Sequence, residues 1–329
     1  MNKRTKTALA VVFLALLVAG SVWILCFRGT ARLRVAEGPV FGTLYHIKYE
    51  CAEPLDSQIV VELRRVDASL SVFNPASTVS RINTGATARA DEMLREVLSR
   101  SLEVSRATGG AFDVTVMPLV NAWGFGFKKG EFPTDAAVDS LRAFVGYRLV
   151  SLCGDSVAKG DPRVMLDFGA IAKGYGVDRV ARLLREHGVR NYMVEIGGEV
   201  VAKGRNPDGR PWQIGVSKPV EGGGDGIIEK VVELSDGAVA TSGNYRNFYE
   251  RDGRKYAHTI DPRTGRPVRH SLLSATVMAR DCATADAYAT AFMVMGLDSA
   301  AAVVKGDKSL RAIFIYSDAQ GKMRVKEVE

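Results

Sequence analysis

A short run near the carboxyl end of the chain, Thr284-Ala-Asp-Ala-Tyr-Ala-Thr290, holds two side chains that could bind a cation through oxygen. Asp286 and Thr290 are four residues apart, so a helix places them on one face. A carboxylate and a hydroxyl suit a Mg²⁺ ion that shares its coordination sphere with phosphate and water. The same pair also fits an ordinary helix start, with the aspartate favouring the helix dipole and the threonine bonding to its own backbone. The pattern alone leaves both interpretations open.

A second run, Met165–Gly176, has the order strand, glycine-containing turn, helix. Asp167 stands at the end of the strand, and Lys173 stands at the start of the helix. Backbone N–H groups at a helix N-terminus favour a phosphate, and a lysine adds positive charge. The run is not a Walker A loop, because Lys173 precedes Gly174 and no Ser or Thr follows. Taken alone, it is an ordinary strand-to-helix turn.

Two further segments offer a possible base and a hydroxyl. Tyr256–Gly265 contains His258 at a predicted strand end, where an imidazole could act as a general base. Ala240–Arg246 contains Ser242, which we interpret as a turn residue or a phosphate donor. The sequence has no HExxH and no GxSxG motif, which excludes the zincin and α/β-hydrolase classes.

Glycine turns and aromatic residues occur together at 109–115 and 121–126. Their faces could stack a flat ring system, although core packing is the commoner use of Trp and Phe.

The elements that must position these residues follow from periodicity and breakers. Alternation over 33–50 predicts a strand, and apolar faces predict helices that begin near Asp56 and Asp91. Without strict βαβ alternation, the pattern predicts an α+β class with mixed or antiparallel sheets and flanking helices. The other predicted strands are 163–168, 192–196, 213–216, 227–234, 244–250, 255–260, 272–278 and 312–316, and the other helices are one ending near 187, 284–295 and 298–304; residues 121–140 are expected to form a loop.

The first residues predict an anchor. Residues 8–27 contain 20 consecutive residues without a charge, enough for a membrane-crossing helix, and Lys3, Arg4 and Lys6 favour a cytoplasmic start. A cleaved signal peptide is the alternative. We expect a cytoplasmic segment 1–7, an inner-membrane anchor 8–27, a linker 28–34 and a periplasmic body 35–329.

Composition and charge exclude other classes. The 329 residues include 44 Lys and Arg against 37 Asp and Glu, a net charge of +7, and the basic excess is concentrated in residues 1–30. The remaining charges are mixed along the chain, so we expect no nucleic-acid partner. The 4 cysteines have no paired spacing, so neither a disulfide framework nor a CxxC metal site is expected.

Together these segments resemble the ApbE family, the FAD:protein FMN transferases. The resemblance rests on segments that follow one another in the family's order: 42–43, 77–83, 110–113, 167–175, 197–199, 240–246, 258–265 and 285–290. It implies a single compact ApbE-like catalytic domain that uses FAD and Mg²⁺ outside the cytoplasm. The implied reaction moves the FMN half of FAD onto a Ser or Thr hydroxyl of a target protein, a covalent flavinylation, and releases AMP. The implied acceptors are subunits of NADH:quinone reductase or Rnf-type electron-transfer complexes.

The resemblance also implies the site residues. The metal would be held by the Ala170 carbonyl, Asp286 and Thr290, with the Ala289 carbonyl nearby, and His258 would stand next to the reacting phosphate. The FAD site would be lined by Ala111, Phe112, Asp113, Asp167, Lys173 and Ile260, together with Phe41 and Phe73. At the last two positions the family often has Met and Tyr, so the stacking on the flavin ring is expected to differ.

The chemistry leaves alternatives open. His258 or Asp113 could take the proton of an attacking hydroxyl, while Mg²⁺ neutralises the diphosphate. If water replaced the protein hydroxyl, the enzyme would be an FAD pyrophosphatase that yields FMN and AMP. A non-catalytic flavin-binding protein is the third possibility.

Overall fold

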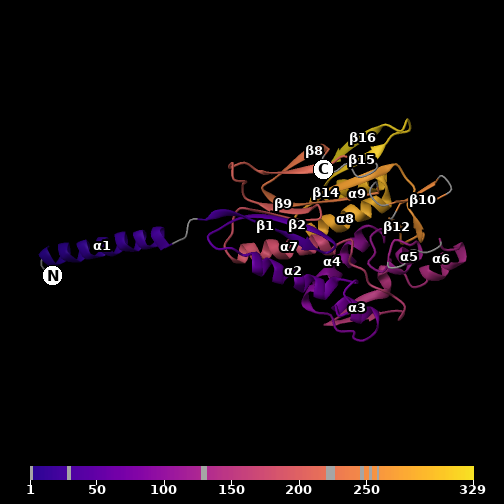
Figure 1. Cartoon of the computed structure of the whole chain (residues 1–329), viewed down its shortest axis with the longest axis horizontal. Coiled ribbons are helices and arrows are strands. Elements are labelled where there is room, and N and C mark those ends of the chain that lie inside the picture. Colours follow the sequence, from indigo (N-terminus) through magenta and orange to yellow (C-terminus); the bar gives the residue numbers. More distant parts are fainter. Residues whose placement is uncertain are drawn as a thin grey trace.

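The computed structural model describes residues 3–27, 31–126, 132–219, 227–244, 248–251, 254–257 and 259–329. One large sheet runs through the body, with helices against one of its faces (Figure 1). Its strand order is β1-β2-β5-β6-β9-β14-β15-β16, and each neighbouring pair is antiparallel. The strands are β1 (Arg32–Val40), β2 (Thr43–Cys51), β5 (Tyr192–Ile196), β6 (Glu199–Lys203), β9 (Asp236–Gly243), β14 (Leu272–Ala279), β15 (Arg311–Ser317) and β16 (Met323–Val328). The predicted α+β class with antiparallel pairing is confirmed.

Two helices lie directly on the sheet. Helix α8 (Cys282–Met295) packs on β9 and β14, and α7 (Ala172–Glu186) packs on β5, on β6 and on α8. Helix α8 is apolar on nearly all sides, as expected for a helix enclosed by other elements. Helices α2 (Asp56–Leu70) and α4 (Glu92–Ala107) add an outer layer against α7 and α8.

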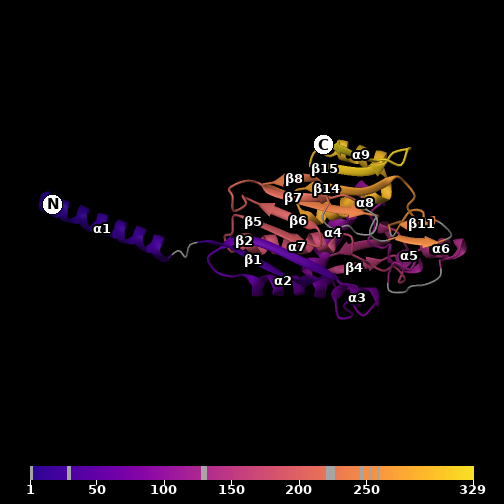
Figure 2. The ribbon, with the colours of Figure 1, turned by 45° about the horizontal axis from the view of Figure 1, so that its top comes forward.

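The other face of the sheet is covered by a hairpin of β7 (Trp212–Ser217) and β8 (Ile228–Leu234), which Figure 2 shows from a tilted direction. Their inward side chains form a separate apolar cluster with β6, β9, β14 and β15. Larger apolar clusters lie on the helix side of the sheet.

Smaller elements connect these layers. They are α3 (Thr78–Asn83), α5 (Met117–Ala122), α6 (Asp135–Arg142), the 3₁₀ turn η1 (Tyr147–Leu149), β3 (Val150–Cys153), β4 (Ser156–Lys159), β10 (Phe248–Arg251), β11 (Arg254–Ala257), β12 (Ile260–Asp261), β13 (Arg266–Pro267) and α9 (Leu297–Gly306).

Three predictions of local structure were wrong. The segment 163–168 joins no sheet; a side chain holds it instead, because Asn83 Nδ2 donates to the Leu166 carbonyl (2.8 Å) and Leu166 N–H donates to Asn83 Oδ1 (2.7 Å). The predicted loop 121–140 contains the start of α6, whose first turn is capped by Thr134. The predicted single strand 33–50 is a hairpin of β1 and β2, which turns at Phe41 and Gly42. The described residues of the predicted strands 244–250 and 255–260 lie largely in β10, β11 and β12.

The amino-terminal segment forms helix α1 (Lys3–Phe27). Among the described residues, no helix combines the length and apolar character needed to cross a membrane. The prediction of a transmembrane anchor over 8–27 is therefore not supported, and the periplasmic location of the body stays a prediction.

Candidate functional site

Helices α7 and α8 cross closely, and this crossing joins the two runs that sequence analysis selected. A Cβ atom on Gly174 would lie 2.4 Å from the Cys282 carbonyl oxygen, so only glycine allows the approach. Gly174 N–H donates to Asp286 Oδ2 (3.0 Å). In return, the Asp178 carboxylate on α7 accepts from the backbone N–H groups of Cys282 (2.9 Å) and Ala283 (2.8 Å). Each helix thus supplies a carboxylate to the amino-terminal turn of the other, which fixes their register.

Three charged side chains meet at this crossing. The Lys173 ammonium donates to Glu199 Oε1, and Asp286 lies within electrostatic reach of both. Glu199 and Asp286 are both only 3% exposed. Burial, helped by the charge of Asp286 and opposed by Lys173, raises the pKa of Glu199. Burial also raises the pKa of Asp286, against the lowering effects of Lys173 and the Gly174 N–H.

The lysine responds in the opposite way. Burial acts to lower the pKa of Lys173, but the charges of Asp286 and Glu199 outweigh it and hold that pKa above its ordinary value. Lys173 therefore stays protonated at neutral pH and can face an anionic group.

A small cavity of about 60 Å³ lies beside this crossing. Seven of the predicted site residues line it, from four separate parts of the chain: Ala111, Phe112, Asp113, Asp167, Ala170, Ile260 and Thr290. The apolar side chains of Val114, Val116, Pro262 and Val294 complete its wall. The structure thus brings together residues that lie up to 179 positions apart in the sequence, from Ala111 to Thr290.

Two carboxylates in the cavity wall are held by the turns around them. Asp113 Oδ1 accepts from the backbone N–H (2.8 Å) and the hydroxyl (2.6 Å) of Thr115, and its Oδ2 accepts from Tyr147 N–H (2.6 Å). Asp167 Oδ1 accepts from Gly169 N–H (2.8 Å). Burial raises the pKa of both carboxyl groups, while these hydrogen bonds act to lower it. Asp113 therefore holds its own turn through Oδ1 and the segment at Tyr147 through Oδ2.

The hydroxyl of Thr290 has a partner in the sheet. Thr290 Oγ1 and Ser242 Oγ are 3.2 Å apart, so α8 and β9 present two hydroxyls at one place. Ser242 belongs to the predicted site by this contact. Ala289 is fully buried one residue earlier on α8.

The two predicted flavin-stacking residues do not line the 60 Å³ cavity. Phe41 has a positive φ of 49° and packs its ring close to Gly176 on α7. Phe73 follows α2 and is 78% exposed. His258 lies outside the described residues, so its predicted position next to a phosphate stays a prediction.

The oxygen donors fit a hard divalent cation. Within the described ranges, no group of three or more His, Cys, Asp or Glu side chains could hold a metal ion. The predicted set is of another kind, with one carboxylate (Asp286), one hydroxyl (Thr290) and backbone carbonyls (Ala170, Ala289). Mg²⁺ is commonly bound through one or two carboxylates, with water and substrate phosphate completing its sphere. Buried Asp286 is the one carboxylate of that set, and the donor chemistry therefore suits Mg²⁺.

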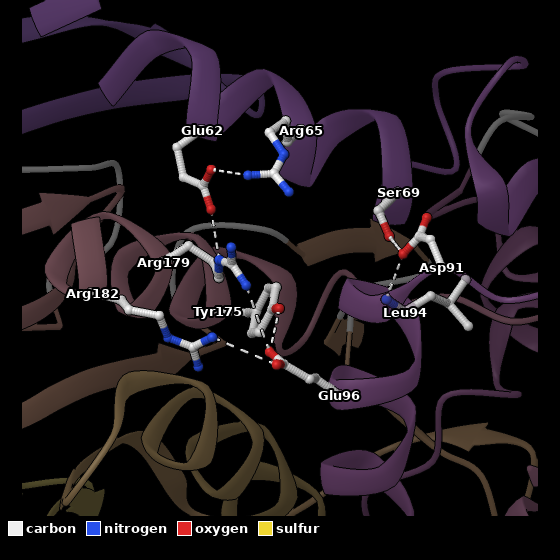
Figure 3. A network of polar contacts seen from close by, with 9 residues as sticks. All are labelled: Glu62, Arg65, Ser69, Asp91, Leu94, Glu96, Tyr175, Arg179 and Arg182. Carbon is white, nitrogen blue, oxygen red and sulfur yellow. Dashed lines mark hydrogen bonds and ion pairs between the residues drawn. The ribbon is translucent and has the colours of Figure 1, made fainter. Parts of the chain in front are cut away.

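A larger cavity of about 800 Å³ opens between α4, α7 and the start of α8. Its wall is mostly charged, and the network beside it is shown in Figure 3. Arg179 Nε donates to Glu62 Oε1 (2.6 Å), and Tyr175 Oη donates to Glu96 Oε2 (2.6 Å). These contacts tie α7 to α2 and α4. None of the predicted site residues lines this cavity, so we assign the site to the smaller one.

Three residues of the site region were missed by sequence analysis as participants: Asn83, Asp178 and Glu199. Asn83 and Glu199 stood in segments that carried the family resemblance, 77–83 and 197–199, but nothing in the sequence indicated what they contact. No sequence pattern indicated a role for Asp178, because its partners are backbone N–H groups more than 100 residues away.

The fold and the cavity define a ligand-binding α+β domain that surrounds a helix N-terminal turn with carboxylates and hydroxyls. Comparison with known proteins narrows this class. The ApbE family model matches residues 41–314, and the chain belongs to the ApbE family.

The relatives and solved structures agree. The chain is 40% identical over 292 residues to the FAD:protein FMN transferase of Vibrio cholerae, covering 85% of this chain and 87% of that protein. It is 38% identical to the FAD:protein FMN transferase of Haemophilus influenzae, covering 85% and 86%. The solved flavin transferase ApbE of Vibrio cholerae superimposes with a TM-score of 0.82 at 36% identity, covering 91% of this chain and 98% of that one. The flavinyl transferase ApbE of Pseudomonas stutzeri, in its apo form, gives 0.82 at 35% identity, covering 91% and 96%.

Proposed function

We propose that this protein is a FAD:protein FMN transferase that attaches FMN to a Ser or Thr hydroxyl of an acceptor protein and releases AMP. The observation that supports it is the contact of the 167–174 turn with α8: Asp167 and Ala170 line one cavity with Thr290, and Gly174 N–H donates to Asp286. The names of the relatives support the same activity.

The reaction breaks the phosphoanhydride bond of FAD and forms a phosphate ester bond. The acceptor oxygen forms a bond to the phosphorus on the FMN side, the P–O bond to the AMP side breaks, and AMP leaves with the bridging oxygen. A Mg²⁺ ion held by Asp286, Thr290 and the carbonyls of Ala170 and Ala289 would supply neutralisation of the diphosphate charge. The cationic Lys173 and the N–H groups at the start of α7 suit the same anionic group.

The acceptor hydroxyl must lose a proton as it attacks. Asp113 already accepts three hydrogen bonds, two from Thr115 and one from Tyr147, which favours His258 as the base. General-base catalysis is typically worth about 10²–10⁴ in rate. We therefore expect His258→Ala to lower transfer by roughly that factor at saturating FAD. Near-normal transfer by this variant would remove His258 from the role.

The test of the function is a mass measurement on the acceptor. The purified protein is incubated with FAD, Mg²⁺ and a candidate subunit of an NADH:quinone reductase or Rnf-type complex. The proposal predicts a gain of one FMN on a Ser or Thr of the subunit. FMN and AMP released with no gain of mass would indicate a pyrophosphatase. FAD binding that EDTA does not change, with no AMP, would indicate a non-catalytic flavin-binding protein.

A further inference from the structure

Glu199 is a buried carboxylate to which the proposed reaction gives no task. It is the first residue of β6 and pairs with Ile196 across a tight turn of Gly197 and Gly198, which have φ values of 61° and 99°. Its side chain is 4% exposed. Among the described residues, its Oε1 accepts from Lys173, and its Oε2 is buried with no hydrogen-bond partner.

A buried carboxylate with one unpaired oxygen destabilises the folded state unless it stabilises a neighbouring group. A buried charge normally has its remaining lone pairs satisfied, because desolvation otherwise costs more than the ion pair returns. Replacing Glu199 by an apolar residue would remove that cost, but it would leave the Lys173 ammonium without its partner. The neighbouring anion is then Asp286, which already acts on the pKa of Lys173.

The consequence concerns the cation site. A lysine paired directly with Asp286 would neutralise the carboxylate and compete with a divalent ion for its oxygens. With Glu199 in place, Lys173 is hydrogen-bonded to Glu199, and Asp286 receives only the Gly174 N–H as its hydrogen bond from α7.

We infer that Glu199 is a positioning residue, which holds the Lys173 ammonium away from Asp286 and so keeps the Asp286 carboxylate available to a divalent cation. The inference rests on the metal site of the proposed function. It deepens that function by assigning the β5–β6 turn a part in cation binding.

The test measures cation binding directly, without turnover. Mn²⁺ alone is titrated into the full chain, and the free ion is followed by its electron paramagnetic resonance signal. We expect Glu199→Gln to raise the Mn²⁺ dissociation constant by about tenfold. The reason is that Lys173 would pair with Asp286 in place of Glu199 and compete with the ion for that carboxylate. Glu195→Gln is the matched control, because Glu195 lies in the same hairpin and accepts from Gly198 N–H (2.8 Å). It should bind Mn²⁺ as the wild type does.

A double variant separates positioning from simple loss of structure. If Glu199 acts by holding Lys173, removing the lysine as well should restore binding, so Lys173→Met combined with Glu199→Gln should return to near the wild-type dissociation constant. A structural role predicts that the double variant binds as poorly as, or worse than, the single one.

The outcomes distinguish the inference from its premise. Equal Mn²⁺ affinity of wild type and Glu199→Gln, with Asp286→Asn abolishing binding, would overturn the role of Glu199 alone. Failure of the double variant to recover would also overturn it. If Asp286→Asn binds Mn²⁺ as well as the wild type, the metal site of the proposed function is wrong, and the inference falls with it.

Discussion

The cavities of about 800 and 60 Å³ satisfy their charges in different ways. In the larger one, between α4 and α7, carboxylates face guanidinium groups, as in the pairs Glu96–Arg182 and Asp281–Arg100. In the smaller one, Asp113 and Asp167 accept from backbone N–H groups and hydroxyls, and burial raises their pKa. A carboxylate paired with an arginine has little left to offer a ligand. Asp113 and Asp167 are held by hydrogen bonds and not by an arginine, which is why size alone does not select the site.

The largest expected effect is at Asp286. Asp286→Asn keeps the shape of the side chain but removes the charge that would hold the cation, so transfer to an acceptor should fall by about 10² or more. The rate of acceptor flavinylation at saturating FAD measures it. Glu96→Gln, in the network of the larger cavity, is the matched control and should stay within about twofold, because surface ion pairs contribute little. A large loss in Glu96→Gln would erase the distinction between the two cavities.

Gly174→Ala tests the helix crossing on which the small cavity depends. The added methyl group would meet the Cys282 carbonyl at 2.4 Å, so α7 and α8 must separate. Overpacking of this kind costs about 1–3 kcal/mol in free energy of unfolding. Denaturant titration measures the change. Gly306→Ala, where a Cβ atom meets nothing within 4 Å, should change stability by less than about 0.5 kcal/mol. Equal stability of the two variants would contradict the close crossing.

Asn83→Ala tests the side-chain clamp on the segment before Asp167. Both hydrogen bonds to Leu166 are lost. A buried backbone group left without a partner costs about 1–3 kcal/mol in free energy of unfolding. We expect a destabilisation near the lower end of that range where water can reach the freed groups. Calorimetric unfolding, together with the FAD concentration for half-maximal rate, checks it. Unchanged FAD dependence with lower stability would confine the clamp to a structural role.

A further effect is a pH dependence of stability from Asp178. Burial is the main cause, and the charge of Asp281 the second, that raises the pKa of Asp178 to about 7 in the folded state. The value in the unfolded state is about 3.9. The folded state therefore holds the proton more tightly, so stability falls as pH rises from about 4 to about 7 and levels off above that. Asp178→Asn should lose this part of the slope in unfolding titrations across that range. An unchanged slope would show that Asp178 is not the group responsible.

Sequence reasoning reached the members of the small cavity but not their contacts. The spacing of Asp286 and Thr290 predicted one helix face, and α8 confirms the helix. Their meeting with the 167–174 turn came from the family resemblance, since no periodicity reports contacts over more than 100 residues. The ion pair of Lys173 with Glu199 depends on where β6 lies in the sheet, and sheet order is set by long-range packing. The contact of Asn83 could not be predicted, because its side chain forms the backbone hydrogen bonds that a neighbouring strand would otherwise form. The apolar segment 163–168 was therefore predicted to be a strand.

The most direct test of the account compares two amounts from one reaction: AMP released and FMN bound covalently to the acceptor. With wild-type protein, FAD and Mg²⁺, the two should rise together in a one-to-one ratio, and both should be lost in Asp286→Asn. Release of AMP with no FMN on any acceptor, or equal transfer by Asp286→Asn, would contradict it.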